Sequence, residues 1–314
     1  MIVSVIDIGS NSIKWVVAER SAKLLKVLRE ESHSTRLAGD LIHTGRLGEE
    51  AIQNTLDVFE HIRKESLHYK IEKATAVATS AVRDSENRKD FLKRAKKILG
   101  YPIQILSGNE EAEIIFQGTS ADPYWKSKDL FVIDIGGGSA EWIQGLKGKI
   151  EKRISLPLGC VRIRERFIKT YPVGIKKVDE ICRKLEEQLL PVLANYQLKD
   201  LILVGTGGTA TCLSAIQQKL KDFDPDRVDH FKLTQKNLES LLKRFSKKKL
   251  ESMLKIVGLP KKRADLIIPG MCVLKVTMDI LGAKELRTST RGLRYGVIER
   301  LVLGPALKQK TLFR

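Results

Sequence analysis

Cysteine is scarce in this sequence of 314 residues, and the four that occur do not stand at the spacing of a metal or redox motif. They are Cys160, Cys182, Cys212 and Cys272. None is placed to act as a covalent nucleophile. We therefore expect reduced thiols in a cytoplasmic protein.

Long apolar runs are also absent. The most apolar long stretch covers residues 264–281, and four residues interrupt it: Asp265, Pro269, Lys275 and Asp279. This excludes a membrane span there. Met1 leads straight into a strand-like run that ends at Asp7, which is not the pattern of a signal peptide.

Acidic residues are outnumbered by basic ones, with 38 Asp and Glu against 56 Lys and Arg and a formal net charge of +18. A strongly basic surface favours a polyanionic partner: nucleic acid, an acidic membrane or a phosphate polymer. Charge alone does not choose among them. The basic runs at residues 243–249 and 261–263 are, taken singly, ordinary solvated helix faces.

An internal repeat organises the chain. Residues 5–16 and 132–143 match at seven of twelve positions at an offset of 127 residues, and residues 74–79 align with 201–206 at the same offset. Each copy opens with a strand ending in Asp-Ile-Gly, a tight turn and a second strand. One fold is therefore used twice.

Helical spacing fills the segments between the expected strands, as at Ile52, Leu56, Phe59 and Ile62. Strands that alternate with helices predict α/β domains. The segment 121–128 reads as a linker around Trp125. We therefore predict an N-terminal domain at 1–125 and a C-terminal domain at 126–314.

The first motif that carries chemistry runs from Asp7 to Ser12. Glycine lets backbone N–H groups approach an anion, and hydroxyl groups add donors. This predicts a phosphate-binding loop made by five residues: Asp7, Gly9, Ser10, Asn11 and Ser12. The alternative is an ordinary polar hairpin.

The second motif runs from Asp134 to Glu141. Three consecutive glycines after an apolar strand are costly unless the backbone bends or touches a ligand. The two carboxylates suit Mg²⁺, which takes one or two and keeps several waters. Phosphate contacts are expected from the residues between them: Gly136, Gly137, Gly138 and Ser139. The alternative is a glycine hairpin with solvated acids.

A third glycine-rich turn joins an apolar strand to a helix N-terminus, which is a ready anion site. Its candidate phosphate ligands are Gly205, Gly207, Gly208 and Thr209. Close packing is the alternative reason for these glycines. Arg83, just after a strand, could hold a phosphate by two hydrogen bonds, although a free surface arginine is the commoner case.

A helix is expected to start near Asn109, because Ser107 and Glu110 stand at the spacing of a capping box. Glu110, Glu111 and Glu113 cluster in its first turn. Acidic residues there commonly offset the helix dipole. Residue types alone therefore do not choose a functional glutamate.

Six motifs together make the chain resemble the exopolyphosphatase and guanosine pentaphosphate phosphohydrolase (Ppx/GppA) family, in the sugar kinase, Hsp70 and actin superfamily. They are D-I-G-S-N-S at Asp7, A-T-S-A-V-R-D-S-E-N at Ala78, S-G-N-E-E-A at Ser107, D-I-G-G-G-S-A-E at Asp134, G-T-G-G-T-A-T at Gly205 and G-L-R-Y-G at Gly292. They span nearly the whole chain in the family's order.

The resemblance implies an α/β fold with two actin-like (ribonuclease H-like) domains and an active site in the cleft between them. It implies that Glu111 is the catalytic base, that Asp134 and Glu141 bind magnesium, and that Arg83 contacts phosphate. The chain departs from the family at Ala140, where a Thr is usual, and at Tyr295, where a Glu is usual. Longer members of the family add helical C-terminal domains. The departure puts in doubt whether this chain can hold very long substrates.

The function that the resemblance implies is Mg²⁺-dependent release of terminal orthophosphate from inorganic polyphosphate, with short or medium chains favoured. The alternatives are guanosine pentaphosphate (pppGpp) hydrolysis, an actin-like ATPase or sugar kinase, and a catalytically silent sensor of such ligands. We expect no need for nucleic acid or membrane, and the family favours a homodimer.

Overall fold

The computed structural model of the chain describes residues 1–21, 24–196, 198 and 200–303. It comprises two compact units. The first unit is formed by Met1–Ala121 and Leu293–Leu303, and the second by Asp122–Gly292. Among the described residues, no helix combines the length and the apolar character needed to cross a membrane.

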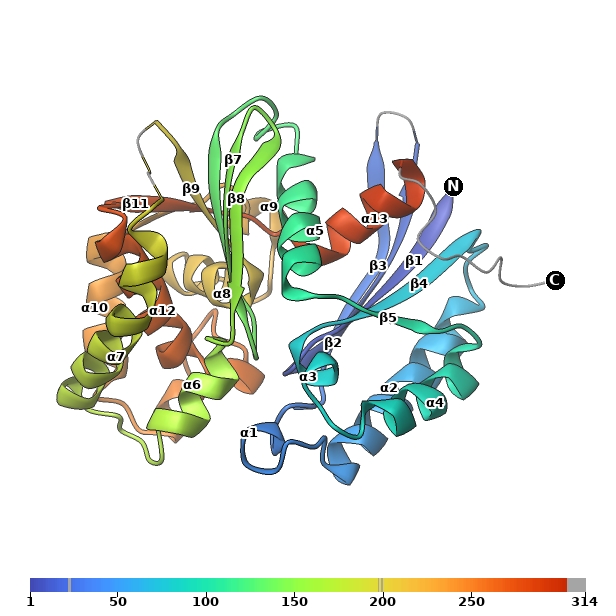
Figure 1. Cartoon of the computed structure of the whole chain (residues 1–314), viewed down its shortest axis with the longest axis horizontal. Coiled ribbons are helices and arrows are strands. Elements are labelled where there is room, and N and C mark those ends of the chain that lie inside the picture. The colour runs from blue at the N-terminus through green and yellow to red at the C-terminus, as the bar shows by residue number, and fades with distance from the viewer. Residues whose placement is uncertain (22–23, 197, 199, 304–314) are drawn as a thin grey trace. The chain divides into compact units, whose positions relative to one another are not determined.

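The first unit is built on a five-stranded sheet with the strand order β3-β2-β1-β4-β5 (Figure 1). The antiparallel hairpins use β1 (Ile2–Ile8), β2 (Ser12–Arg20) and β3 (Leu25–Ser34). β4 (Lys73–Ala78) runs parallel to β1, and β5 (Ile103–Ile105) runs parallel to β4. β3 is therefore an edge strand.

Helices cover both faces of this sheet. They are α1 (Leu41–Thr44), α2 (Glu49–Ser66), α3 (Ser80–Arg83), α4 (Arg88–Leu99), α5 (Gly108–Ser120) and α13 (Leu293–Leu303). Ile6 and Ile8 of β1 join the core formed with α2 and α4. The alternate residues Val3 and Val5 are buried on the opposite face, because successive side chains of a strand point to opposite sides. α13 contacts β1 and α5.

The second unit repeats this plan in a six-stranded sheet of order β10-β11-β9-β6-β7-β8. Its strands are β6 (Leu130–Ile135), β7 (Ala140–Leu146), β8 (Lys149–Leu156), β9 (Ile202–Thr206), β10 (Lys232–Thr234) and β11 (Glu285–Thr288). β8-β7-β6-β9 has the order and directions of β3-β2-β1-β4. The predicted repeat and the predicted α/β class with two domains are thereby confirmed.

The helices of the second unit pack mainly around α12. They are α6 (Cys160–Phe167), α7 (Ile175–Leu193), α8 (Gly207–Gln217), α9 (Pro225–Val228), α10 (Gln235–Phe245), α11 (Leu250–Met253), the short 3₁₀ turn Lys261–Arg263 and α12 (Ile267–Ile280). α12 is the apolar stretch noted in the sequence, and its side chains are almost all buried in the core. α7 continues for two residues past Pro191.

The division of the chain differs from the predicted ranges 1–125 and 126–314. Residues 293–303 form α13, which belongs to the first unit. Val297, Ile298 and Leu301 of α13 are buried, and Arg20 pairs with Glu299 at 3.1 Å. Trp125, placed in a linker by the sequence, is buried with its ring edge-on to His230 in the second unit.

Candidate functional site

The turn between β1 and β2 holds the first predicted phosphate loop. The Gly9 N–H donates to the Ser12 carbonyl at 3.1 Å and closes the turn. Asp7 is buried and lies 3.9 Å from Lys14, its cross-strand partner. The hydroxyl groups of Ser10 and Ser80 share a buried hydrogen bond of 2.9 Å. The loop is thereby fixed to the start of α3.

Asn11 anchors the same loop on its other side. Its carbonyl accepts the backbone N–H groups of Thr35 and Arg36 at 3.2 and 3.1 Å, and its amide donates to the Ser12 hydroxyl at 3.1 Å. These bonds fix the backbone of the turn before any ligand arrives. Ser10, Asn11 and Ser12 are all buried in this turn.

Arg83, the last residue of α3, faces Glu111 in the first turn of α5. Its Nη1 donates to the Glu111 carboxylate at 3.1 Å and to the Leu106 carbonyl at 2.8 Å. Glu111 is only 7% exposed. The alternative of a free surface arginine is therefore excluded. Because α3 also begins at Ser80, it brings the first loop and Glu111 into one neighbourhood of the first unit.

The three glutamates of α5 have three different partners, which the sequence did not reveal. Glu110 completes the capping box with Ser107, whose hydroxyl and backbone N–H donate to its carboxylate and lower its pKa. Glu113 pairs with Arg300 of α13 at 2.7 Å. Glu111 is the buried one, and it lies against the predicted phosphate-binding arginine.

In the second unit, Asp134 of β6 and Glu141 of β7 are directly opposed cross-strand partners. Side chains at such positions lie side by side on one face. Glu141 is 1% exposed and accepts the Ser155 hydroxyl at 2.7 Å. Asp134 is half-buried, and the sheet brings the two predicted metal ligands together.

The Asp134 carboxylate also lies against two glycines. A side chain on Gly207, whose φ is +74°, would overlap Asp134 Oδ1. One on Gly292 would lie 3.4 Å from Asp134 Oδ2 and 2.9 Å from the Thr206 hydroxyl. The backbone at the start of α8 and the backbone before α13 therefore leave room for this carboxylate.

The glycine loop from Gly136 to Ser139 is held by the start of α6. The backbone N–H groups of Cys160 and Val161 donate to the carbonyls of Gly136 and Gly137 at 2.9 and 2.8 Å. The Gly136 N–H donates to the Ser139 carbonyl at 3.0 Å and closes the turn. Ser139 is buried, and the backbones of Gly137 and Gly138 lie against Gly159.

The third predicted loop divides into two kinds of residue. Gly205 packs against Ala210 and Leu286, and buried Thr209 lies against Gly270. Gly207 and Gly208 begin α8 instead.

Arg263 covers this start of α8, because a side chain on Gly208 would overlap its guanidinium. This places a cation at a helix N-terminus that itself favours anions.

Sequence reasoning missed four residues that support these groups: Ser80, Ser155, Arg263 and Gly292. Ser80 and Gly292 lay inside recognised motifs without an assigned role. Arg263 belonged to a basic run interpreted as a solvated face. Nothing in the sequence pointed to Ser155, since only the register of β7 and β8 pairs it with Glu141.

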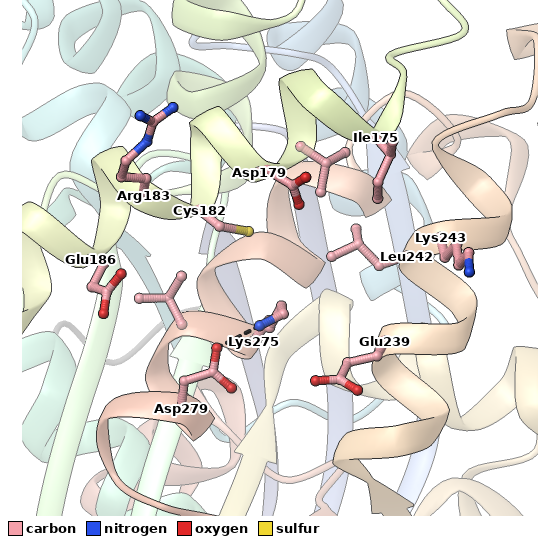
Figure 2. Close-up of a pocket in the computed structure, with 12 residues that line it drawn as sticks. Ile175, Asp179, Cys182, Arg183, Glu186, Glu239, Leu242, Lys243, Lys275 and Asp279 are labelled. Atoms are coloured by element: carbon pink, nitrogen blue, oxygen red, sulfur yellow. Dashed lines mark hydrogen bonds and ion pairs between the residues drawn. The ribbon is translucent and has the colours of Figure 1, made fainter.

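A pocket of about 550 Å³ lies between α7, α10 and α12 of the second unit (Figure 2). Its wall includes Asp179, Cys182, Glu239 and the ion pair of Lys275 with Asp279 at 2.6 Å. None of the predicted site residues lines it. It is separate from the carboxylates and glycine turns described above.

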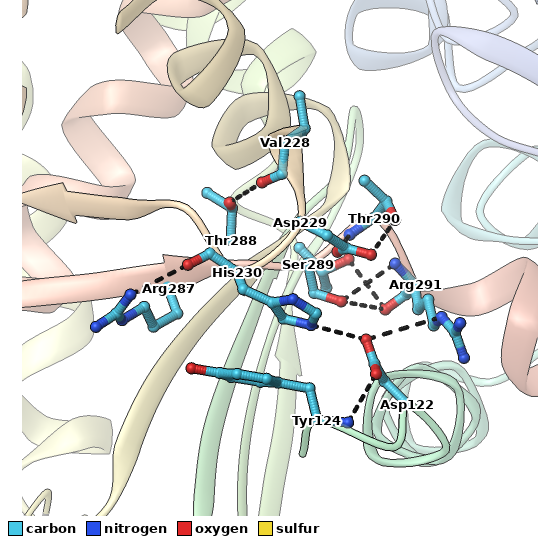
Figure 3. Close-up of polar contacts among 11 residues, drawn as sticks. Asp122, Tyr124, Val228, Asp229, His230, Arg287, Thr288, Ser289, Thr290 and Arg291 are labelled. Atoms are coloured by element: carbon cyan, nitrogen blue, oxygen red, sulfur yellow. Dashed lines mark hydrogen bonds and ion pairs between the residues drawn. The ribbon is translucent and has the colours of Figure 1, made fainter. Parts of the chain in front are cut away.

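A second polar cluster of this unit ties down the segment before Gly292 (Figure 3). His230 contacts Asp122 at 2.9 Å, and Asp229 accepts both the backbone N–H and the hydroxyl of Thr290. Burial raises the pKa of Asp229. These contacts fix the backbone that reaches Asp134 at Gly292.

Comparison with known proteins gives consistent results along the chain. A family model described as the Ppx/GppA phosphatase family matches residues 16–304. The chain is 34% identical over 293 residues to a bifunctional 3-dehydroquinate synthase/phosphatase of Fusobacterium nucleatum, covering 88% of this chain and 43% of that protein. It is 29% identical to exopolyphosphatase 2 of Mycobacterium tuberculosis, covering 91% of each.

Solved structures agree in fold. The Ppx/GppA family member of Aquifex aeolicus is 30% identical, with a TM-score of 0.83 and coverage of 96% of this chain and 98% of that one. An exopolyphosphatase from Cytophaga hutchinsonii is 24% identical, with a TM-score of 0.88 over 96% and 97% of the chains. At that identity, only the fold is compared.

Proposed function

Because the chain belongs to the Ppx/GppA phosphatase family, we propose that it is an exopolyphosphatase that releases terminal orthophosphate from inorganic polyphosphate with the help of Mg²⁺. The family makes it a phosphatase, as the sequence predicted. Relatives named as exopolyphosphatases at 29% and 28% identity, aligned over most of their length, support this substrate.

The observation that carries the proposal is the contact between the buried carboxylate of Glu111 and the partly exposed guanidinium of Arg83. A carboxylate that accepts a proton from water makes the water a better nucleophile. The water oxygen forms a bond to the terminal phosphorus, its proton passes to Glu111, and the bond from phosphorus to the bridging oxygen breaks. Orthophosphate leaves with a chain that is one phosphate shorter.

The residues of the second unit suit the charged part of the substrate. Asp134 and Glu141 supply the hard oxygen ligands that Mg²⁺ prefers, and the room made by Gly207 and Gly292 fits a carboxylate with a ligand beside it. Bound there, Mg²⁺ would neutralise charge on the phosphate oxygens. The start of α8 and Arg263 would attract phosphate directly.

The experiment that tests the proposal compares phosphate release from polyphosphate of defined length, from pppGpp and from ATP, with Glu111→Gln as the inactive control. Preferential release from polyphosphate supports it. A preference for pppGpp would replace it with the pentaphosphate hydrolase, and a preference for ATP with the ATPase or kinase class. Tight binding without turnover at saturating Mg²⁺ would indicate a sensor.

We also propose a cytoplasmic location and a homodimer. No disulfide joins the four cysteines, all of which lie in the described part of the chain, and reduced thiols are usual in the cytoplasm. Light scattering on the purified chain measures the oligomeric state.

A further inference from the structure

A histidine and carboxylate cluster on the first unit has no part in the proposed reaction. Glu31 and His33 stand two residues apart on the edge strand β3, so their side chains share a face. His61 reaches the same place from α2. The Nε2 atoms of His33 and His61 lie 2.7 and 2.9 Å from the same oxygen, Glu31 Oε2.

From this convergence we propose that Glu31, His33 and His61 form a binding site for a borderline-soft divalent cation, of which Zn²⁺ is the representative. Two imidazole nitrogens and one carboxylate oxygen are a donor set typical of zinc. The three ligand atoms lie within 4.8 Å of one another. In a tetrahedral zinc site, neighbouring ligand atoms are about 3.3 Å apart. Small rotations of both rings therefore make room for the ion.

The groups around the cluster support a cation. Arg29 donates to the other oxygen, Glu31 Oε1, at 2.7 Å, and so orients the carboxylate without covering Oε2. Glu65 lies 3.6 Å from the same guanidinium and balances its charge. Hydrogen-bonded outer partners of this kind fix the geometry of metal ligands.

Burial raises the pKa of Glu31, but hydrogen bonds from His33, His61 and Arg29 outweigh burial and lower it to about 2. The side chains of His33 and His61 are 33% and 42% exposed, so solvent reaches the position where a fourth ligand would stand.

The other cluster with metal-binding residue types serves as a contrast. Asp122, Asp229 and His230 also bring their ligand atoms within 4.8 Å. There, however, only one of the three ligand atoms is an imidazole nitrogen, and the other two belong to carboxylates. That cluster therefore lacks the pair of histidines on which the proposed zinc site depends.

The test uses the untagged full chain, stripped of metal with a chelator and held in excess Mg²⁺ to fill sites made of oxygen ligands. Co²⁺ is titrated while visible absorption is recorded, because four-coordinate Co²⁺ absorbs far more strongly than six-coordinate Co²⁺. Zn²⁺ then competes. We expect one equivalent of four-coordinate Co²⁺, displaced stoichiometrically by Zn²⁺.

His33→Ala and His61→Ala should each weaken binding by more than about tenfold, since even outer partners of metal sites are worth 10–100-fold. Glu31→Gln, which keeps the shape, should weaken it as well. His43→Ala and His68→Ala remove exposed histidines outside the cluster and should leave affinity unchanged. His230→Ala tests the contrasting cluster and should also leave it unchanged.

Phosphate release shows that the variants of Glu31, His33, His61, His43 and His68 are folded, because none of these residues belongs to the proposed catalytic machinery. Circular dichroism serves the same purpose for His230→Ala, since His230 helps to fix the backbone next to Asp134. The absence of a four-coordinate signal in the wild-type chain would overturn the proposal. So would a signal that survives in both His33→Ala and His61→Ala.

Discussion

The guanidinium of Arg83 donates to the carboxylate of Glu111 at 3.1 Å, which joins the end of α3 to the first turn of α5. In the proposed reaction, a phosphate competes with Glu111 for this guanidinium, because phosphate oxygens also accept hydrogen bonds from the planar guanidinium of arginine. Substrate binding would draw Arg83 towards phosphate and leave the Glu111 oxygen to accept a proton from water.

Glu111→Gln should leave the protein folded and able to bind substrate but reduce kcat by about 10²–10⁴-fold, the usual contribution of a general base. Initial rates of phosphate release measure this. The matched control is Glu110→Gln, since glutamine also completes a capping box. A crippled Glu110→Gln beside a nearly normal Glu111→Gln would show that the two roles are reversed.

Arg83→Lys should raise KM by roughly tenfold or more. Lysine keeps the positive charge but cannot donate two parallel hydrogen bonds to a phosphate. The size of the change follows from hydrogen bonds to charged groups, which are worth about 1.5–3 kcal/mol. Arg94→Lys, in the same unit but paired with Glu49, is the control. Equal KM values in both variants would argue against a phosphate contact at Arg83.

Asp134→Asn and Glu141→Gln should each raise the Mg²⁺ concentration at half-maximal activity, since each removes a charged ligand from a hard cation. Asp179→Asn, at the pocket between α7 and α10, serves as the control in the same unit. An unchanged Mg²⁺ concentration at half-maximal activity in both site variants would contradict the proposal that Asp134 and Glu141 bind Mg²⁺.

Gly207→Ala should lower both stability and Mg²⁺ affinity, because its φ is +74° and a side chain there would displace Asp134 Oδ1. Gly148→Ala provides a close control, with a φ of +75° and no atom within 4 Å of the added carbon. The control should lose only about 1 kcal/mol of unfolding free energy, from backbone strain. Urea unfolding measures the loss of stability, and Mg²⁺ titration measures the loss of Mg²⁺ affinity. Equal losses in Gly207→Ala and Gly148→Ala would show that the added side chain does not displace Asp134.

Salt should weaken the affinity for long polyphosphate steeply while changing turnover of bound short chains less. Exposed basic residues that hold the distal phosphates are screened over about 8–10 Å in 0.1–0.15 M salt. We therefore expect release after few cleavages and a preference for short or medium chains. A time course in which intact long chains persist beside free phosphate would contradict this.

Much of the fold was predictable from the sequence because the repeated segments are themselves strands joined by tight turns. Asp-Ile-Gly at Asp7 and Asp134 marks the two equivalent strand ends, and the structure places both there. α13 was not predicted as part of the first unit, since it follows β11 in the chain and β11 belongs to the second unit. Its place depends on long-range packing by Val297 and on the ion pair of Arg300 with Glu113.

The sequence predicted which residue types could form the candidate site, but it did not predict which residues each of them contacts. The motif around Ser107 offered three glutamates of equal standing, and only their tertiary partners distinguish Glu111. Gly205 and Thr209 also pack against Leu286 and Gly270, contacts that the sequence did not reveal, and their role as phosphate ligands stays a prediction.

The return of α13 to the first unit has a consequence for synthesis on the ribosome. The second unit, Asp122–Gly292, is continuous in sequence and can fold as soon as it has emerged. The first unit is interrupted, so α13 reaches it only after the whole inserted unit has been translated. Until then, the face of β1 that carries Val3 and Val5 lacks the helix that contacts it. The N-terminal part of the chain thus completes its folding last, although it is made first.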